Sequence, residues 1–205
     1  MTPTTKLEAV NIMLSTIGES PVNSLSSGLV DAELAETILD ATSRAVQSET
    51  WHFNRESKVR FAPNLSGEII LPTNILKADA NLDADSINRQ TSTGQPLDLV
   101  QRGTKMYDKY NHTFNIGKSV ELDIVVGLDF DELPEVAKRY ITIKAGRTFQ
   151  DRVVGSSTLH GFQEADEARA YYELKETEGD TSDFNILNNY DVFAVIDRVS
   201  GKRIY

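Results

Sequence analysis

The sequence predicts an α+β fold: an antiparallel four-helix body of two helical hairpins, an inserted small antiparallel β subdomain and an extended C-terminal tail. Apolar residues recur at helical spacing before residue 51 and after residue 127, and strand-type alternation lies between these stretches. Two helical hairpins that flank strands favour an insertion into one helical body. The predicted parts are 1–50 and 128–178 for the helical body, 51–127 for the β-rich insertion and 179–205 for the tail.

The first hairpin is predicted from caps and periodicity. Its first helix is expected to follow Thr4 or Thr5 and to stop at Gly18. The apolar positions of this helix are Leu7, Val10, Met13, Leu14 and Ile17. Asp31 is expected to cap the second helix, which would end near Trp51. The inner side of that helix is predicted to carry Leu34, Ile38, Ala41 and Ala45.

The insertion is predicted from short β-type runs. KVRFAP and GEIILP both end in proline, and residues 74–85 are mixed in character and predicted to be mostly loop. A turn is expected at Gly103. SVELDIVV places four alternate apolar residues on one face, and Gly127 ends that run.

The second hairpin has the clearest pattern in the chain. Pro134 suits a first helical position, and Asp131 and Glu132 place negative charge near the positive end of the helix dipole. The apolar stripe of this helix contains Ala137, Ile141, Ala145 and Phe149. Residues 155–158 interrupt the pattern, and a returning helix follows. Its inner side is predicted to carry Phe162, Ala165, Ala168 and Tyr172.

The net charge of -10 is concentrated in the helical regions. Residues 1–50 carry 2 basic and 7 acidic side chains, and residues 128–178 carry 7 and 11, whereas residues 51–127 carry 9 of each sign. Such acidic helices cannot bind the phosphate backbone of a nucleic acid by electrostatic attraction. No apolar run has the length of a membrane span, and the absence of cysteine excludes disulfides and thiolate metal sites.

No catalytic or cofactor-binding signature is present in the sequence. His52, His112 and His160 lack a second ligand at metal-site spacing, so a solvated or capping role is favoured for them. Six carboxylates could suggest glycoside hydrolysis, although charge at helix starts more often serves the helix dipole and solubility. These carboxylates are Asp129, Asp131, Glu132, Glu164, Asp166 and Glu167.

Several stretches together resemble a known family. They are AVNIMLSTIGESPVNSL, WHFN, RGTKMYDK, DFDELPEVAKRYITIKAGRTFQDRVVGS and EADEARAYY. In this order, over about residues 7–178, they resemble the tail tubular protein A family of short-tailed, podovirus-type bacteriophages. The segment after Glu178 departs from the family pattern.

The resemblance implies a structural adaptor, also called a gatekeeper or head-to-tail connector, rather than an enzyme. It implies a dodecameric ring that joins the portal vertex to the tubular nozzle and surrounds the DNA ejection channel. The implied partners are further copies of the chain, the portal protein, the nozzle (tail tubular protein B) and the tail fibre. DNA would pass without specific binding, and no cofactor, metal or membrane is implied. The expected location is the virion tail, after synthesis in the host cytoplasm.

Three groups of residues are candidate contacts for such an adaptor. A ring needs a heterologous subunit interface, for which the candidates are Arg139, Lys144, Arg147, Arg152, Glu164, Asp166 and Glu167. A basic and aromatic group in the insertion is the candidate nozzle contact, and it contains Arg102, Lys105, Tyr107, Lys109 and Tyr110. The tail is expected to meet the portal or a neighbouring subunit through Val192, Phe193, Val195, Ile196, Arg198, Lys202 and Arg203.

Two other functions remain open at this point. The six carboxylates leave a glycan-hydrolysing tail component as an alternative. The second alternative is a DNA-binding module, which the basic and aromatic group of the insertion could form. Pairing of that group with an acidic protein neighbour suits the overall charge better.

Overall fold

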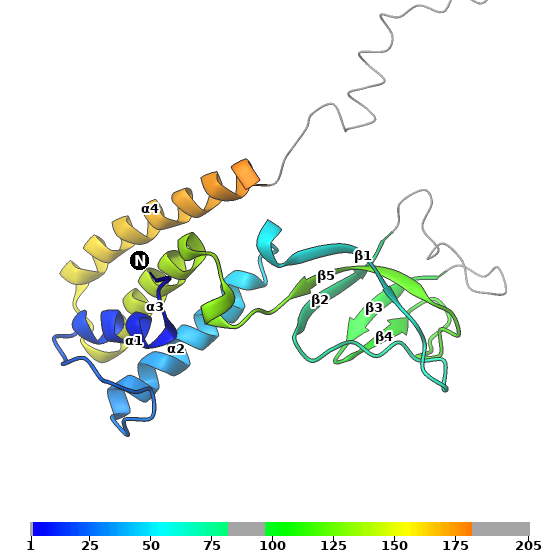
Figure 1. Cartoon of the computed structure of the whole chain (residues 1–205), viewed down its shortest axis with the longest axis horizontal. Coiled ribbons are helices and arrows are strands. Elements are labelled where there is room, and N and C mark those ends of the chain that lie inside the picture. Colours follow the sequence, from blue (N-terminus) through cyan, green and yellow to red (C-terminus); the bar gives the residue numbers. More distant parts are fainter. Residues whose placement is uncertain (1, 82–96, 182–205) are drawn as a thin grey trace, which may run out of the picture.

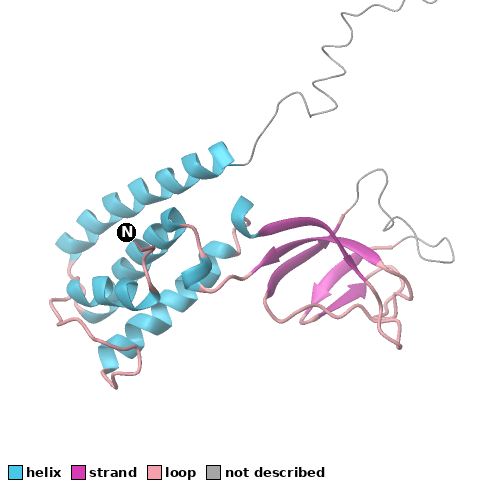
Figure 2. Cartoon of the chain, in the orientation of Figure 1, coloured by secondary structure: helices cyan, strands magenta, loops and turns pink. Residues whose placement is uncertain are grey.

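The computed structural model describes residues 2–81 and 97–181 of an elongated molecule with helices at one end and a sheet at the other (Figure 1, Figure 2). The α-helices are α1 (Lys6–Ser15), α2 (Val30–Gln47), α3 (Glu135–Val153) and α4 (Ser157–Thr181). The strands are β1 (Arg55–Phe61), β2 (Ile75–Ala80), β3 (Leu99–Arg102), β4 (Lys105–Asp108) and β5 (Val120–Val126). The α+β class is confirmed, whereas the antiparallel pairing of two hairpins into a four-helix body stays a prediction.

Helix α1 begins at a reciprocal cap. The Thr5 side chain accepts a hydrogen bond from the backbone N–H of Glu8, and the Glu8 carboxylate accepts one from the N–H of Thr5. Thr5 is therefore confirmed as the N-cap. The following loop is held by Asn11, whose side-chain amide both donates to and accepts from the backbone of Val22.

Helix α2 buries only part of the side predicted to face inward: Ile38 is buried and Leu34 packs against the core, as predicted. Leu29 occupies the N-cap position without a side-chain hydrogen bond, so the prediction that Asp31 caps this helix is wrong. Ala41 and Ala45 are exposed, and they too were wrongly placed on the inner side. Alanines carry little apolar area, so the larger Leu39 and Val46 determine which face is buried. The buried residues are Ala32, Ala35, Ile38, Leu39, Ser43, Val46 and Gln47.

Helix α3 carries the stripe that its sequence predicts. Ala137, Ile141, Ala145 and Phe149 are all fully buried. Pro134 lies at the N-cap position rather than the first helical position, and its carbonyl accepts the backbone N–H of Lys138. Asp131 and Glu132 belong to a preceding 3₁₀ turn, η3 (Phe130–Glu132).

Helix α4 is rotated relative to its predicted orientation. Ala170 and Leu174 face the core, while the side chains of Phe162 and Tyr172 are 70% and 71% exposed. The prediction that Phe162, Ala165, Ala168 and Tyr172 form the inner side is therefore wrong, because all four are exposed. The inward side instead includes Glu167, whose charge is matched by Arg147 on α3. An ion pair thus occupies a position where periodicity alone expects an apolar residue.

The sheet is antiparallel, with the strand order β1-β5-β2-β3-β4. Residues 120–126 form a strand, as their alternation predicts, and this strand lies between β1 and β2; β3 and β4 form a hairpin around Gly103 at φ +62°. GEIILP is not a strand: only isolated bridges, Glu68 to Asn115 and Ile70 to Lys105, connect it to its neighbours. Strand β2 instead lies within residues 74–85, so the prediction of mostly loop is wrong there.

Two separate apolar clusters fill the two ends. The helical cluster draws residues from all four helices and includes Trp51, whose indole N–H donates to the Val46 carbonyl at 2.7 Å. The Trp51 ring stacks on Phe53 and meets Tyr171 of α4 edge-on. The second cluster lies under the sheet and includes Ile69, Met106 and Leu122. No residue belongs to both clusters.

The cap of α1 can be tested by Thr5→Ala. We expect this change to lower the free energy of unfolding by about 1 kcal/mol, because the backbone N–H of Glu8 loses its side-chain acceptor at the helix start. The control is Thr37→Ala on the exposed side of α2, where the hydroxyl bonds only to the Glu33 carbonyl within its own helix. Urea unfolding monitored by circular dichroism measures the free energy of unfolding of both variants. An equal loss of stability in the two would contradict the role of the cap.

Candidate functional site

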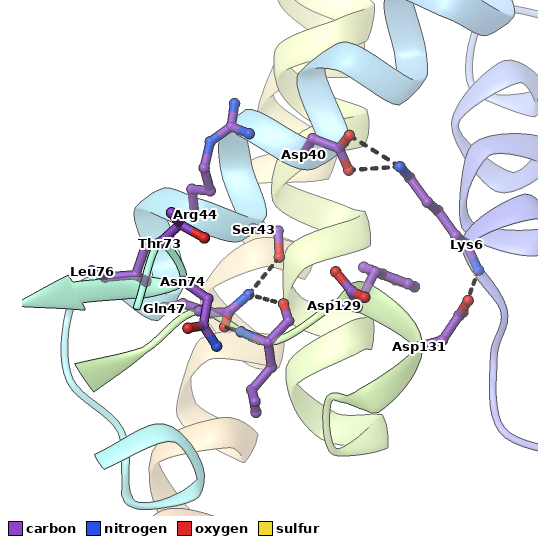
Figure 3. Close-up of a pocket in the computed structure, with 13 residues that line it drawn as sticks. Lys6, Asp40, Ser43, Arg44, Gln47, Thr73, Asn74, Leu76, Asp129 and Asp131 are labelled. Atoms are coloured by element: carbon purple, nitrogen blue, oxygen red, sulfur yellow. Dashed lines mark hydrogen bonds and ion pairs between the residues drawn. The ribbon is translucent and has the colours of Figure 1, made fainter. Parts of the chain in front are cut away.

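The junction between the two ends is held by the buried side chain of Gln47, the last residue of α2 (Figure 3). The Gln47 amide nitrogen donates to the Leu128 carbonyl at 3.0 Å and to the Ser43 hydroxyl at 2.9 Å. The Gln47 amide oxygen accepts the Leu128 N–H at 2.7 Å. One side chain therefore satisfies both backbone groups of the residue through which the chain returns from the sheet.

Asn54 holds the segment through which the chain passes from α2 to β1 in the same way. Its amide nitrogen donates to the Gln47 carbonyl at 2.8 Å and to the Val126 carbonyl at 3.2 Å, and its amide oxygen accepts the Trp51 N–H at 3.0 Å. Only 2% of Asn54 is exposed. Asn54 and Gln47 together connect the end of α2, the start of β1 and the end of β5.

A polar hollow of about 500 Å³ lies beside this junction. Its wall comes from α1, α2, the turn before β2 and the segment after β5, as Figure 3 shows. Gly127 forms the tight part of the wall: its N–H donates to the Asn74 carbonyl, and a Cβ there would lie 3.2 Å from the Leu76 side chain. Among the residues that the structure describes, no group of three His, Cys, Asp or Glu side chains is placed to hold a metal ion.

Helix α1 is joined to the same region by charges. The Lys6 ammonium pairs with Glu36 at 2.8 Å and Asp40 at 2.9 Å on α2. Burial alone would lower the pKa of Lys6, but the hydrogen bonds and charges of these two carboxylates outweigh it and the pKa is raised. The Lys6 backbone N–H donates to the Asp131 carboxylate at 2.9 Å, so Asp131 serves the start of α1 rather than that of α3.

Glu135 is the second carboxylate at the start of α1. It accepts hydrogen bonds from the hydroxyl and the backbone N–H of Thr4. These two bonds, the hydroxyl first, hold the pKa of Glu135 below its ordinary value of 4.5. The buried Lys138 ammonium donates to the Asp131 carbonyl at 2.9 Å and supports the same turn.

The predicted subunit-interface residues lie along the contact between α3 and α4. Arg147 pairs with Glu167 at 2.5 Å, with both side chains mostly shielded, and Arg139 pairs with Glu173 in a more exposed position. Asp166 lies 3.8 Å from Arg169 on α4. Two of the four predicted basic residues thus hold the hairpin together within one chain.

A charged groove brings four of the predicted residues together. It is lined by Glu49, Tyr140, Lys144, Arg147, Glu164, Glu167, Ala168 and Tyr171. The Lys144 ammonium donates to the Tyr140 hydroxyl at 3.1 Å. Burial lowers the pKa of Lys144, but this hydrogen bond and the nearby Glu49 and Glu167 charges raise it more, so the ammonium form is favoured. Arg152 lies outside the groove, exposed near the end of α3, and has no partner within the described ranges.

The exposed face of α4 was missed by the sequence reasoning. Phe162, Ala165, Arg169 and Tyr172 follow one another at helical spacing, and all four are exposed. The apolar spacing itself was the available signal, but it was assigned to the inside. This face stands opposite Ala170 and Leu174, so α4 has apolar residues on two sides.

The predicted nozzle-contact residues divide into two groups. Arg102, Lys105 and Tyr107 lie on β3 and β4, and the Arg102 guanidinium stands 3.7 Å above the Tyr107 ring centre. Lys109 and Tyr110 belong instead to the turn after β4. That turn is organised by buried Asp108, which accepts the N–H groups of Tyr110 and Asn111. Burial raises the pKa of Asp108, but its hydrogen bonds outweigh burial and the pKa is lowered.

The six carboxylates considered for hydrolysis are not gathered into one site. Asp131 binds the start of α1, and Glu132 accepts the N–H of Asp129. Glu167 pairs with Arg147, twelve residues along α3 from Glu135, which corresponds to about 18 Å of helix. A hydrolytic carboxylate pair needs a separation of roughly 5–10 Å.

The predicted tail contacts lie outside the described residues. They are Val192, Phe193, Val195, Ile196, Arg198, Lys202 and Arg203. Among the helices that the structure describes, none combines the length and apolarity required to cross a membrane.

Comparison with known proteins identifies relatives. A family profile described as tail tubular protein matches residues 7–184. A protein named tail tubular protein A, from Klebsiella phage KP34, is 28% identical over 170 residues, which cover 82% of this chain and 83% of the relative. Both matches extend over the helices and the sheet alike.

The junction can be tested by Gln47→Leu, which keeps the size of the side chain but removes its polar atoms. We expect the free energy of unfolding to fall by about 2 kcal/mol, because the N–H and carbonyl of Leu128 lose their partner in a shielded place. Ser48→Ala, one residue further and exposed, is the control. Chemical denaturation measures both, and equal stability of Gln47→Leu and the wild type would contradict the assigned role.

The hydrogen bonds from Thr4 to Glu135, which hold the start of α1, predict that the stability of the fold depends on pH. Because the folded-state pKa of Glu135 lies below 4.5, its stabilising contribution is present above that pH and is lost as pH falls through the folded pKa. Thermal unfolding between pH 7 and pH 3 should therefore show the wild type above Glu135→Gln at neutral pH, with the two converging in acid. A gap that widens in acid would reverse the assigned sign.

Proposed function

We propose that this chain, which belongs to the tail tubular protein family, is the adaptor between the portal vertex and the tubular nozzle of a bacteriophage tail. Family membership makes it a structural component of a phage tail. The adaptor role is the proposal, and one observation supports it most: two separately packed ends are joined by a hydrogen-bonded junction. Such a molecule can hold one partner at each end with a set spacing.

The helical end is proposed to build the ring. The two helical stretches 1–50 and 128–178 act as one body of two antiparallel hairpins, and copies meet through unlike faces as a closed ring requires. The exposed α4 face with Phe162 and Tyr172 supplies the apolar part of this contact. Arg152 and Glu164 supply charged positions without partners in the described parts of the chain. Twelve copies form the ring in this proposal.

The acidic surface of the ring suits a DNA channel. The helical regions hold most of the net charge of -10, which repels phosphate and lets DNA pass without being bound. The sheet, inserted as 51–127 with balanced charge, faces the nozzle and uses Arg102, Lys105 and Tyr107. The portal meets the ring, with residues 179–205 contributing to the portal or neighbour contact, and the tail fibre attaches further out. Synthesis takes place in the host cytoplasm before assembly into the virion tail.

The glycan-hydrolysing alternative is not proposed. Asp131, Glu132 and Glu167 each have a structural partner, and the carboxylates of residues 129–132 and 164–167 stand on different parts of the fold. A structural role explains these carboxylates without invoking chemistry.

Assembly can be tested by the mass of the purified chain alone, with the portal protein and with the nozzle protein of the same phage. The proposal predicts a complex with each partner and a ring mass equal to twelve copies on the portal. Binding to neither partner would overturn the adaptor role, whereas a different copy number would overturn only the dodecamer.

The tail can be tested by ending the chain after Glu178. Because the buried residues of both apolar clusters lie before residue 179, we expect the shortened chain to fold, with a circular dichroism spectrum close to that of the full chain and weaker assembly on the portal. Light scattering of the mixture measures this assembly. Unchanged portal binding by the shortened chain would contradict the role of the tail.

A further inference from the structure

The outer face of the β3–β4 hairpin carries an arrangement that the fold does not need. Arg102 and Lys105 are directly opposite each other across the two strands. Two like charges in that relation destabilise a hairpin. The Glu68 carboxylate pairs with Lys105 at 2.8 Å, which offsets only one of the two charges.

Arg102 is held in place but not neutralised. Its guanidinium lies 3.7 Å above the ring centre of Tyr107, in a cation–π contact that uses the face of the guanidinium and leaves its N–H groups at the edge. Within residues 2–81 and 97–181, these N–H groups reach no acceptor. The Tyr107 ring is fixed in turn by Phe114, at 4.9 Å between ring centres and in an edge-to-face arrangement.

Apolar residues surround this fixed cation. Ile70 is bridged to Lys105, and residues that oppose each other across a bridge point to the same side of the sheet. Ile70 is 52% exposed and Phe114 is 37% exposed. Lys105 and Tyr107 are two residues apart on β4, so they too share this side. The outer face of the hairpin therefore combines exposed apolar side chains, an aromatic anchor and a preorganised arginine, the composition typical of an interface hot spot.

We infer that this face, made of Ile70, Arg102, Lys105, Tyr107 and Phe114, binds a protein surface that presents a carboxylate beside an apolar side chain. The carboxylate accepts the two parallel N–H bonds of Arg102, and the apolar neighbour covers Ile70 and Phe114. The partner's carboxylate thus matches the charge of Arg102, for which no described residue of the chain supplies a carboxylate. The inference rests on the proposed nozzle contact and names the chemistry of that partner.

A nucleic acid fits this face less well. Single-stranded nucleic acid needs open aromatic faces for base stacking and a track of cations along its backbone. Arg102 covers one face of Tyr107, Phe114 packs against the same ring, and Lys105 is already paired with Glu68. An acidic protein surface is therefore the occupant that the geometry favours.

The test uses the full chain and the nozzle protein of the same phage in a titration that yields the dissociation constant. Arg102→Glu should weaken binding by about a hundredfold and Phe114→Ala by about tenfold, the range of hot-spot substitutions. Arg102→Lys should retain part of the binding, because charge remains but the paired N–H geometry is lost. Arg60→Glu is the matched control: Arg60 is exposed on β1, at the opposite edge of the sheet, and binding should change less than about twofold.

The outcomes separate the two claims. If the wild type binds the nozzle protein and Arg102→Glu binds equally well, this inference is overturned while the nozzle contact stands. If the wild type binds the portal but not the nozzle protein, both the nozzle contact and the inference are overturned. Retention of the wild type on single-stranded DNA that Arg102→Glu abolishes would overturn the assignment of a protein partner. Arg102→Gln, read with its thermal unfolding midpoint, separates loss of binding from loss of folding.

Discussion

The rest of the structure depends on how the chain crosses between its two ends. It leaves the helices after α2, returns after β5, and both crossings contain backbone groups away from solvent that need partners. Gln47 and Asn54 supply these partners with two amide side chains, each of which acts as donor and acceptor. An amide suits this place because it satisfies N–H and carbonyl groups together without bringing a charge into a shielded site. The relation between the two ends is therefore set by directional bonds as well as by packing.

The α+β class could be predicted from the sequence because the apolar periodicity changes sharply between helix and strand. The strong stripe of α3 and the alternation of β5 were predicted for the same reason. The inner side of α4 and part of the inner side of α2 were not, since Ala41 and Tyr172 are apolar yet exposed, and Glu167 is charged yet faces α3. Periodicity identifies an apolar face but cannot distinguish the core from a surface that awaits a partner.

The structure places the candidate contact residues in different settings, for a related reason. Arg102, Lys105 and Tyr107 share one face because the hairpin register places them there, whereas Lys109 and Tyr110 follow in the turn that Asp108 organises. Arg139 and Arg147 pair within the chain, which the sequence could not reveal without the packing of α3 on α4. The sequence signal for Gln47 is weaker: it is a polar residue four positions after Ser43, on the buried side of α2. Such a position indicates a buried hydrogen-bonded group but does not name its distant partner.

In the proposed adaptor the two ends have different tasks: the acidic helical end forms the ring around DNA, and the charge-balanced sheet carries a fixed arginine. The central claim is that one chain holds the portal side and the nozzle side apart through an unchanged junction. Electron cryomicroscopy of the chain bound to both portal and nozzle proteins tests it most directly. The account predicts helices in the ring at the portal, sheets against the nozzle, and the bonds of Gln47 to Leu128 intact in every copy. Sheets against the portal, or a junction opened on assembly, would contradict it.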